Sequence, residues 1–507
     1  MSRTPRLLPL LLCALSLGAA DRPNIVFILA DDLGYAEVGF NGQAKILTPH
    51  VDRLAKEGLV LSRHYSGNAV CAPSRSVLMT GFSPGHAHAR DNRDIGDREQ
   101  TPLPVDALTV ARTLKDAGYV TGAFGKWGLG GFGSSGNPMK QGFDRFLGLT
   151  SQWVAHSHYP KAVWDDGREV LLDNGPEGTP GHARFPEGAN PLDPAAYAPF
   201  IGKDFLGERL VRGAEDFIAR NAGGRFFLYY ASTLPHVSLQ IPEADLRKYD
   251  GKFPEDPPFT PANPGSYVPN RTPRATYAAM ITRLDAEVGR IIAALEKAGV
   301  ADNTLVVFSS DNGATHDVGG VETKFFSSVG SLRGLKGSLH EGGVRMPTVV
   351  RWPRSCPPGR RSARISGFED WHVTFAEAAG ALTPAKHDGE SLLATIKGQD
   401  APRTGPLYRE FAGYGAQQAI WDGRWKAIRT DMLKAARAGN PVTTQLYDLE
   451  ADPNETTDLA PKFPKIVKEL EAKMTAARVP NPDFPLPGVD PLPATIGKGK
   501  KKAAAKK

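Results

Sequence analysis

The stretch that decides the fold is Asn24-Ile-Val-Phe-Ile-Leu-Ala30, which is followed directly by Asp31 and Asp32. An unbroken apolar run of this length predicts a strand that is buried on both faces of a parallel sheet. Because open α/β sheets bind ligands at the carboxyl ends of their strands, the two aspartates lie where a ligand is expected. Adjacent carboxylates repel each other, so a hard cation such as Ca²⁺ is the natural partner, with a solvated acidic turn as the alternative. The stretch therefore predicts an α/β fold with a metal site at the end of this strand.

A second apolar run, Thr304-Leu-Val-Val-Phe308, leads into Ser309-Ser-Asp311-Asn312-Gly313. It repeats the same design, a buried strand with oxygen ligands at its carboxyl end. Since the strands of a parallel sheet end at one edge, Asp311 and Asn312 are expected beside the two aspartates of the first strand. The sequence therefore predicts a Ca²⁺ site that is built from two strand ends.

Helical and strand patterns alternate around these two runs. Helices are predicted at 48–58, 105–118, 205–221, 277–298 and 371–380, and strands at 59–65, 119–124, 226–230 and 348–352. Residues 161–200, rich in Gly, Pro and Asp, and the Pro-rich residues 252–274 predict loops. We expect the first of these loops to be a surface insertion near the mouth of the site. The alternation predicts one large α/β domain over residues 21–400.

The pattern changes near residue 401. Short alternating stretches at 407–411, 418–421, 425–429 and 445–449 predict an antiparallel sheet, and a helix is predicted at 466–478. Residues 401–480 are therefore expected to form a smaller subdomain of an antiparallel sheet plus a helix. The Pro-rich and Lys-rich residues 481–507 predict a disordered, solvated tail, with polyanion binding as the alternative.

Residues 1–20 have the pattern of a signal peptide. Arg3 and Arg6 precede the apolar run Leu7–Leu17, and Gly18-Ala19-Ala20 supplies a small-residue cleavage site. The pattern predicts export to the periplasm or the exterior. The apolar run is too short for a permanent bilayer helix, so no membrane span is predicted.

The net charge of +6 is concentrated at the chain ends, and residues 498–507 alone hold six lysines. The rest of the chain is close to neutral. We therefore predict no nucleic-acid partner.

A cysteine motif, Cys71-Ala-Pro-Ser-Arg75, is followed closely by Thr80-Gly81. Pro73 suits the first turn of a helix, which would place Cys71 at a helix N-terminus, where negative charge is stabilised. The motif resembles the C-x-P-S-R signature of the type I sulfatases, in which this cysteine is oxidised to formylglycine. The resemblance implies a formylglycine-generating maturation enzyme as a partner. The alternatives are an ordinary buried thiol, or a disulfide with Cys356.

A second block, Gly125-Lys126-Trp127-Gly128, resembles a sulfatase signature in which histidine follows G-K-W. Lys126 matches the signature and Gly128 departs from it. In the family that histidine contacts the formylglycine hydroxyl, so we hypothesise that His156 or His158 takes over its proton transfer. By order along the chain, His156 resembles the family's next active-site histidine.

Two later blocks complete the resemblance. Pro235-His236 at a strand end resembles the family's histidine that contacts the sulfate ester, and Lys336 in Arg333-Gly-Leu-Lys336 resembles its sulfate-binding lysine. Asp388-Gly-Glu-Ser-Leu-Leu393 is similar to a D-G-x-S-L-L turn of the same family.

The resemblance spans residues 22–478 and implies a complete reaction. It implies the alkaline phosphatase/sulfatase fold, a large mixed, mostly parallel sheet sandwiched by helices. It implies hydrolysis of a sulfate monoester by a formylglycine hydrate, through a covalent sulfo-enzyme, with one Ca²⁺. The implied catalytic residues are Cys71, Arg75, Lys126, His156, His236 and Lys336, and the implied metal ligands are Asp31, Asp32, modified Cys71, Asp311 and Asn312.

Several substrates and rival functions stay open at this stage. Export and a polar, tryptophan-bearing insertion favour a sulfated carbohydrate, such as an N-acetylgalactosamine-6-sulfate-like or algal glycan, and an aryl sulfate is equally compatible. A phosphomonoesterase or phosphodiesterase of the same superfamily would normally carry serine or threonine at the nucleophile and bind zinc. A non-catalytic sulfated-glycan binder would keep Cys71 as a thiol.

Overall fold

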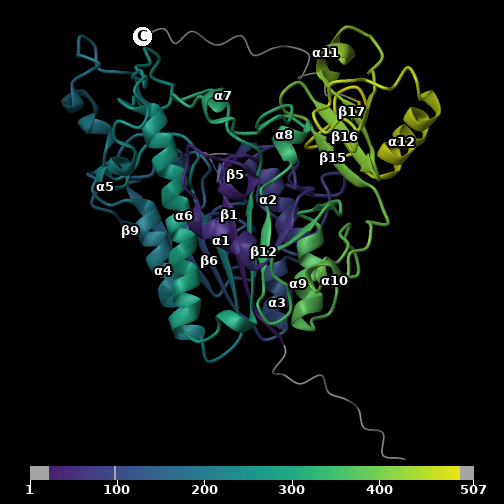
Figure 1. Ribbon diagram of the computed structural model, residues 1–507, viewed down its shortest axis with the longest axis horizontal. Helices are drawn as coiled ribbons and strands as arrows, with labels where there is room; N and C mark the ends of the chain where they lie inside the picture. The colour runs from purple at the N-terminus through teal and green to yellow at the C-terminus, as the bar shows by residue number, and fades with distance from the viewer. Residues whose placement is uncertain (1–21, 96–98, 492–507) are drawn as a thin grey trace, which may run out of the picture.

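The computed structural model describes residues 22–95 and 99–491. Its centre is a ten-stranded sheet in the order β13-β2-β12-β11-β1-β10-β6-β7-β8-β9 (Figure 1). The predicted signal peptide lies outside the described residues. Within these two ranges, no helix combines the length and the apolar character that a bilayer crossing requires.

The middle of the sheet consists of parallel strands. β1 (Asn24–Ala30) pairs on one side with β11 (Thr304–Ser310) and on the other with β10 (Phe226–Ala231). The sheet continues from β10 through β6 (Val120–Lys126) to β7 (Arg145–Leu149), also in parallel. All five strands therefore end at the same edge, and the predictions of buried strands before Asp31 and Asp311 are confirmed.

Helices cover both faces of this sheet, as the α/β prediction requires (Figure 1). Alternate residues of β1 pack into two separate hydrophobic clusters, which is why the strand is apolar without interruption. One cluster includes residues of α1 (Pro49–Glu57), α4 (Leu206–Asn221) and α6 (Pro273–Lys297). The other includes residues of α2 (Cys71–Thr80), α3 (Val110–Asp116), α9 (Asp370–Ala379) and α10 (Leu393–Ile396).

Some predicted bounds differ from those in the structure, and the helix predicted at 277–298, for example, begins earlier, at Pro273. The predicted helix at 105–118 begins only at Val110, because the Thr109 side chain caps it by accepting a hydrogen bond from the Arg112 amide. The predicted strand at 59–65 splits into β2 (Leu59–Leu61) in the large sheet and β3 (His64–Tyr65), which pairs with β14 (Ser366–Gly367).

The outer strands include antiparallel pairs, so the sheet as a whole is mixed parallel and antiparallel. β12 (Val349–Arg351) runs antiparallel to β11 and to β2, and β13 (Arg360–Ser362) lies parallel to β2. At the other edge, β8 (Ala162–Asp165) and β9 (Arg168–Leu171) form an antiparallel hairpin. The prediction of a loop insertion over 161–200 is therefore wrong for its first part. The missed signal is Asp166-Gly167, a hairpin turn in which both residues have positive φ.

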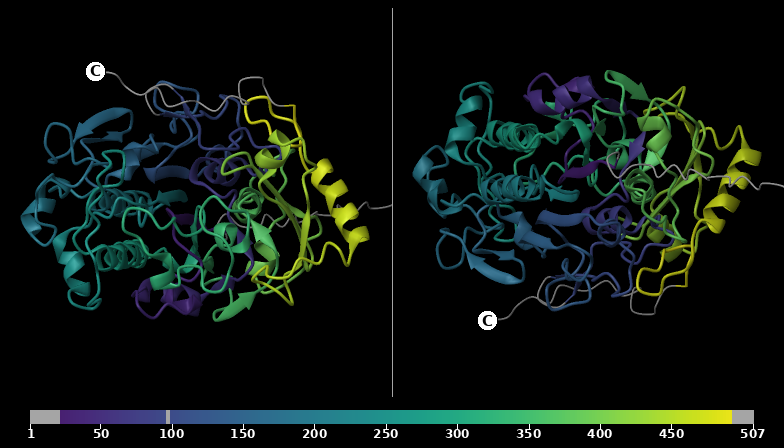
Figure 2. Two further views of the ribbon diagram at one scale, coloured as in Figure 1. Left: turned by 90° about the horizontal axis from the view of Figure 1, so that it is seen from above. Right: turned by 90° about the horizontal axis from the view of Figure 1, so that it is seen from below.

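The C-terminal subdomain contains the predicted antiparallel sheet and the predicted helix, together with a short helix, α11 (Met432–Arg437), that was not predicted. Its strands are β15 (Leu407–Phe411), β16 (Gln417–Asp422), β17 (Trp425–Arg429) and β18 (Gln445–Asp448), paired in chain order. Helix α12 (Pro464–Ala476) packs Leu470 and Met474 against the sheet. In Figure 2 the subdomain, coloured yellow-green to yellow, lies at one end of the long axis.

The tail prediction is wrong for residues 481–491. Phe484 and Leu486 are buried there, and Asp490 pairs with Arg478 at 2.6 Å. The remainder of the predicted tail lies outside the described residues.

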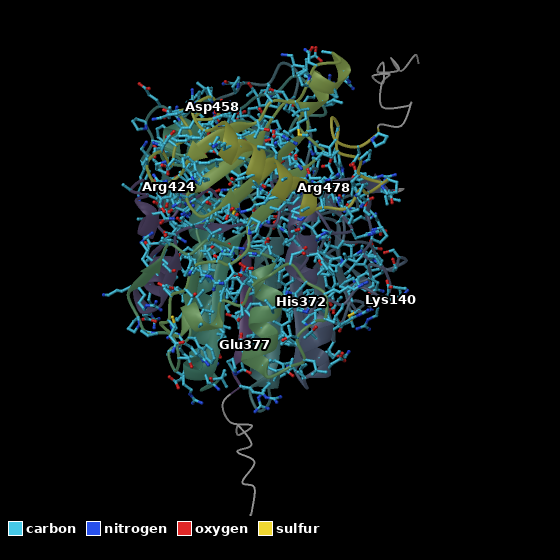
Figure 3. All side chains as sticks on the ribbon, turned by 90° about the vertical axis from the view of Figure 1, so that its right-hand side faces the viewer. Lys140, His372, Glu377, Arg424, Asp458 and Arg478 are labelled. Carbon is cyan, nitrogen blue, oxygen red and sulfur yellow. The ribbon has the colours of Figure 1, made fainter. Side chains whose placement is uncertain are left out.

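Buried charges join the subdomain to the large domain. Arg409 on β15 pairs with Glu369 at 2.8 Å, and Lys426 on β17 pairs with Glu341 at 3.1 Å. All four side chains are almost completely buried. Figure 3 shows the subdomain, with Arg424 and Arg478 labelled, directly above the part of the large domain that carries His372 on α9.

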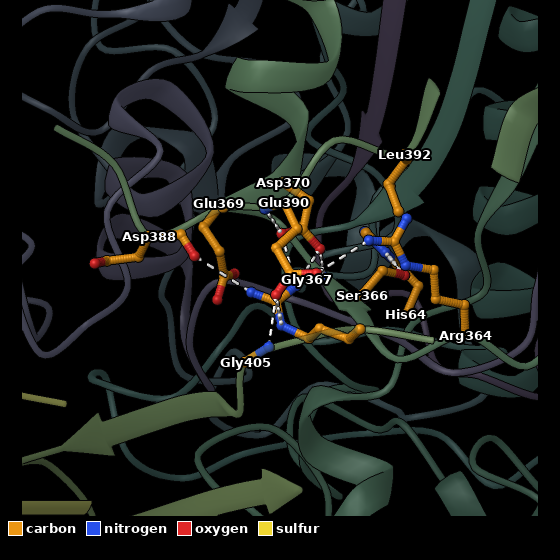
Figure 4. Close-up of polar contacts among 12 residues, drawn as sticks. His64, Arg364, Ser366, Gly367, Glu369, Asp370, Asp388, Glu390, Leu392 and Gly405 are labelled. Carbon is orange, nitrogen blue, oxygen red and sulfur yellow. Dashed lines mark hydrogen bonds and ion pairs between the residues drawn. The ribbon is translucent and has the colours of Figure 1, made fainter. Parts of the chain in front are cut away.

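A second polar cluster fixes the start of α9 (Figure 4). The Asp370 carboxylate accepts hydrogen bonds from the amides of Gly367 and Glu390, at 2.8 and 2.7 Å, and pairs with Arg403 at 2.7 Å. This cluster holds the 388–393 turn, which the sequence singled out, against α9.

The shorter elements connect these parts. They are η1 (Gly39–Asn41), β4 (Asp94–Ile95), β5 (Glu99–Gln100), η2 (Val154–His156), η3 (Pro194–Phe200), α5 (Glu243–Leu246), η4 (Arg247–Tyr249), η5 (Ala301–Asn303), α7 (Thr323–Phe326), α8 (Glu341–Val344) and α11 (Met432–Arg437).

Candidate active site

The carboxylates of the two predicted strand ends meet. Asp31, Asp32 and Asp311 are fully buried, and the Asp32 amide donates a hydrogen bond of 3.2 Å to Asp311 Oδ1. Asp32 has a left-handed φ of 66°, a conformation that aspartate tolerates better than most residues. This turn ends β1 abruptly and places two successive carboxylates at the edge of the sheet.

Cys71 faces these carboxylates from the first turn of α2. Its Sγ lies 3.5 Å from Asp31 Oδ1, 3.5 Å from Lys126 Nζ and 3.6 Å from Lys336 Nζ. Burial raises the pKa of the Cys71 thiol to about 12 even though the two lysines oppose the shift. The unmodified thiol is therefore protonated at neutral pH.

Three cations balance the three carboxylates. Lys126 Nζ lies 2.6 Å from Asp31 Oδ2, and Lys336 Nζ lies 2.8 Å from Asp32 Oδ1. Burial alone would raise the pKa of Asp32, but the charges of Lys336 and Lys126 outweigh it and hold that pKa below its ordinary value.

Arg75 is the third cation. It lies one turn after Cys71 on α2, and its Nη2 pairs with Asp311 Oδ2 at 2.7 Å. Its Nη1 also donates to the carbonyl oxygen of Lys126. Burial, with the charge of Asp31 adding to it, raises the pKa of Asp311 to about 6 although Arg75 opposes the shift.

Possible metal ligands gather around Cys71, and the oxygen donors among them suit a hard divalent cation once the thiol has been replaced by an oxygen. Ligand atoms of Asp31, Asp32, Cys71 and His236 all lie within 4.8 Å of one another. Next to them, Asn312 Nδ2 donates to Asp32 Oδ1 at 2.7 Å, while Asn312 Oδ1 is buried without a hydrogen-bond partner. A buried carbonyl oxygen beside two carboxylates is a donor set that Ca²⁺ prefers.

The grouping differs from the predicted ligand set in two respects. His236, which we predicted to contact the substrate, lies within the group, with its Nε2 3.5 Å from Asp32 Oδ2. Asp311, which we predicted as a ligand, is occupied by Arg75 and the Asp32 amide.

The two candidate histidines both adjoin His236 and differ in their hydrogen bonds. The His156 ring stacks on the His236 ring, with centroids 4.8 Å apart and planes 13° apart. The His158 ring uses both nitrogens, Nδ1 with Thr233 Oγ1 at 3.2 Å and Nε2 with the His236 carbonyl at 2.9 Å. His158 therefore holds the backbone of His236, whereas His156 contacts its ring.

Aromatic residues that the sequence analysis missed extend this stack outward. His182 hydrogen-bonds His156 at 2.8 Å, and its ring stacks on Trp153 at 4.4 Å and on Tyr267 at 4.7 Å. We call His236, His156, His182, Tyr267 and Trp153 the ring cluster. Its outermost member, Trp153, is 36% exposed. The sequence pattern did not indicate the cluster, because His182 and Tyr267 lie in segments that we predicted as loops.

The subdomain contributes one further ring near Lys336. Tyr414, in the loop between β15 and β16, stacks on His316 with centroids 5.3 Å apart and is 58% exposed. It packs against Gly337, so a side chain at that position would collide with the Tyr414 ring.

Cys71 and Cys356 are both buried and free. The alternative of a disulfide between them is therefore excluded in this structure.

Comparisons with known proteins agree with this geometry. The Sulfatase family model matches residues 23–381, and the model of the N-sulphoglucosamine sulphohydrolase C-terminal region matches residues 335–480. Arylsulfatase A from Bos taurus is 32% identical over 94% of this chain and 93% of its own length. An N-acetylgalactosamine-6-O-sulfatase from Bacteroides thetaiotaomicron is 28% identical over 90% of this chain and 94% of its own length.

Solved structures give the same answer. The crystal structure of Ps i-CgsB aligns with a TM-score of 0.72 and 27% identity, over 90% of this chain and 92% of that chain. Its complex with k-i-k-neocarrahexaose aligns with a TM-score of 0.71. The matched family model covers the strand ends, the cysteine helix and the lysines that form the site. The chain therefore belongs to the sulfatase family and is a sulfuric ester hydrolase.

Proposed function

We propose that this enzyme removes sulfate from a sulfated carbohydrate, after Cys71 has been oxidised to formylglycine by a maturation enzyme. The observation that carries the carbohydrate assignment is the ring cluster, which runs from His236 beside Asp32 out to the exposed Trp153. The ring of a tyrosine or tryptophan can cover the apolar face of a ligand while its O–H or N–H group still finds a hydrogen-bond partner. Two relatives support the assignment, one named an N-acetylgalactosamine-6-O-sulfatase and one solved with k-i-k-neocarrahexaose.

Each residue of the site has a role in this proposal. Formylglycine supplies, as its hydrate, an oxygen nucleophile at residue 71. Arg75 and Lys126 orient that residue and neutralise charge around it. Lys336 and His236 bind sulfate oxygens and stabilise the charge that develops on them. Sulfatases usually have a histidine at the position of Gly128, and His156 carries out the proton transfer of that histidine here.

Asp31, Asp32 and Asn312 would hold Ca²⁺, together with the oxygen that replaces the thiol of Cys71. Asp311 would join them only through the lone pairs that its bonds to Arg75 and the Asp32 amide leave free. The ion would add positive charge where the sulfate group binds. We further propose that residues 1–20 direct export to the periplasm or the exterior, which sequencing of the mature N-terminus would test.

Replacing Trp153 by alanine is expected to lower kcat/KM for a sulfated glycan about tenfold and to leave a small aryl sulfate within about twofold. Losing the cover of one apolar face costs about 1.5 kcal/mol, which corresponds to roughly a factor of ten. Steady-state rates on both substrates measure the ratio.

Trp425→Ala is the matched control, because Trp425 packs at a tilt against Phe463 in the subdomain, 5.4 Å between centroids, outside the ring cluster. It should leave the ratio of the two kcat/KM values unchanged. Equal losses on glycan and aryl sulfate for Trp153→Ala would count against the carbohydrate assignment.

Calcium is expected to stabilise the folded enzyme. Protein freed of metal by a chelator should show a higher Tm when Ca²⁺ is restored, because a ligand at 100 times its Kd adds about 2.7 kcal/mol to the free energy of unfolding. Differential scanning calorimetry measures the shift. Asn312→Ala, which removes the unpaired oxygen, should reduce it. An identical Tm with and without Ca²⁺ would contradict the proposed site.

A further inference from the structure

Gln152 has a buried side chain whose polar atoms are unsatisfied. The residue is 6% exposed, and both Nε2 and Oε1 are buried without a hydrogen-bond partner. Among residues 22–95 and 99–491, it is the one amide side chain with both atoms in this state. Because an unpaired buried donor or acceptor is costly, nearly all such groups in native proteins have a partner. The hydrogen-bond partner of the Gln152 amide is therefore expected to be a group outside the protein chain.

The backbone places Gln152 at the active-site edge of the sheet. It follows β7, whose last residue, Leu149, pairs in register with Lys126, the last residue of β6. The two loops stay joined beyond the strands, since the amides of Trp127 and Gly128 donate to the carbonyls of Leu149 and Thr150 at 2.9 and 3.2 Å. The turn that carries Gln152 thus lies against the loop that follows Lys126.

Gly128 makes room for the Gln152 amide. It has a left-handed φ of 75°, and a Cβ atom at this position would overlap Gln152 Nε2. The amide therefore occupies the space that a side chain at residue 128 would need. Glycine at residue 128, where the family usually has histidine, therefore leaves the space that the Gln152 side chain fills.

Catalytic groups lie on both sides of this turn. On one side, Lys126 Nζ lies 2.6 Å from Asp31. On the other side, the turn continues into His156, whose ring stacks on His236. The turn that carries Gln152 thus runs from the strand end beside Lys126 to the histidine that stacks on His236.

We propose that Gln152 is a substrate-binding residue that selects sulfated sugars over aryl sulfates. Its Nε2 donates to a hydroxyl oxygen of the sugar, and its Oε1 accepts from a neighbouring hydroxyl group. A sulfated carbohydrate offers hydroxyl groups that accept and donate side by side, whereas an aryl ester such as 4-nitrophenyl sulfate has none. This inference rests on the proposed function.

The test is Gln152→Met, which keeps the length of the side chain and removes both polar atoms. The substrates are 4-nitrophenyl sulfate and the best substrate in a panel of N-acetylgalactosamine, galactose and glucosamine sulfates. We expect kcat/KM to fall at least tenfold for the sugar and no more than threefold for the aryl ester. We expect a Tm equal to or above that of the parent enzyme, because two unpaired buried polar atoms are removed.

Gln141→Met is the matched control. Gln141 is also buried and its Oε1 is likewise unpaired, but its Nε2 donates to the carbonyls of Pro104 and Ser135, at 2.9 Å each. The same change there should lower the Tm and leave the ratio of the two kcat/KM values unchanged. If Gln152→Met behaved in this way, its role would be structural and the inference would be overturned.

A double-mutant cycle tests the placement. Gly128→Ala strains the left-handed backbone in any background and should in addition displace the amide, so the loss in sugar kcat/KM that it causes should be smaller in the Gln152→Ala background than in the parent. Additive losses would refute the placement. A wrong proposed function would give a different result from a wrong role for Gln152, because the parent enzyme itself would then cleave no sulfated sugar.

Discussion

Replacing Cys71 by alanine is expected to abolish sulfate-ester hydrolysis, with kcat reduced by a factor on the order of 10⁴ to 10⁶, the range seen when a covalent nucleophile is removed. The neighbours of the thiol are Asp31, Lys126 and Lys336. None of them can replace residue 71 as the nucleophile, because each is held in an ion pair. The fold should persist, because a single small side chain leaves only a small cavity and costs about 1 kcal/mol. Single-turnover assays on an aryl sulfate measure the loss.

Cys356→Ala is the matched control, since Cys356 is also a free, buried cysteine. This variant should retain parental kcat and show a comparable change in stability. Intact mass spectrometry of the parent enzyme should give a mass lower by the difference between a thiol and an aldehyde. An active parent with an unmodified thiol, or an active Cys71→Ala variant, would defeat the assignment of residue 71.

Replacing Arg75 by methionine is expected both to inactivate the enzyme and to destabilise it by about 3–5 kcal/mol, because a buried charge then loses its partner. The guanidinium is fully buried and pairs with Asp311 at 2.7 Å, while Asp31 lies 3.7 Å away. Without Arg75, two buried carboxylates keep too little compensating charge. Urea denaturation measures the change in the free energy of unfolding.

The control for this prediction is Arg409→Met, which also removes a fully buried arginine from a carboxylate, Glu369 at 2.8 Å. A similar stability loss is expected, but the folded fraction should keep its kcat because Arg409 lies at the subdomain junction. Arg75→Lys should be intermediate, since lysine keeps the charge and cannot form the same pair of bonds. A stable or active Arg75→Met variant would show that this ion pair is dispensable.

The central strands and the core of the site were predictable from the sequence. β1 and β11 are buried on both faces, so each is an unbroken apolar run, and each ends in acidic residues that face one edge. Local residue patterns therefore carried the information. The motif around Cys71 could be placed on a helix because Pro73 fits only its first turn.

Features that depend on long-range contact were not predictable. The ring cluster joins residues from four loops or short helices, and nothing in the sequence around His182 or Tyr267 marks them as neighbours of His156. Gln152 is an ordinary glutamine until its amide is found over Gly128. The Asp166-Gly167 hairpin, by contrast, carried a local signal that the Gly- and Pro-rich composition of its surroundings obscured.

The buried ion pairs at the subdomain junction have a consequence for how this protein can be divided. Glu369 and Glu341 belong to the large domain, and the cations that neutralise them, Arg409 and Lys426, come from the subdomain. A chain cut near residue 400 would separate the members of both pairs and expose to water the apolar cluster that spans the junction, which includes Tyr65, Val344, Leu407 and Trp421, so neither fragment should fold alone. Any chimera made by exchanging C-terminal segments with a relative must therefore bring both members of each pair from the same parent.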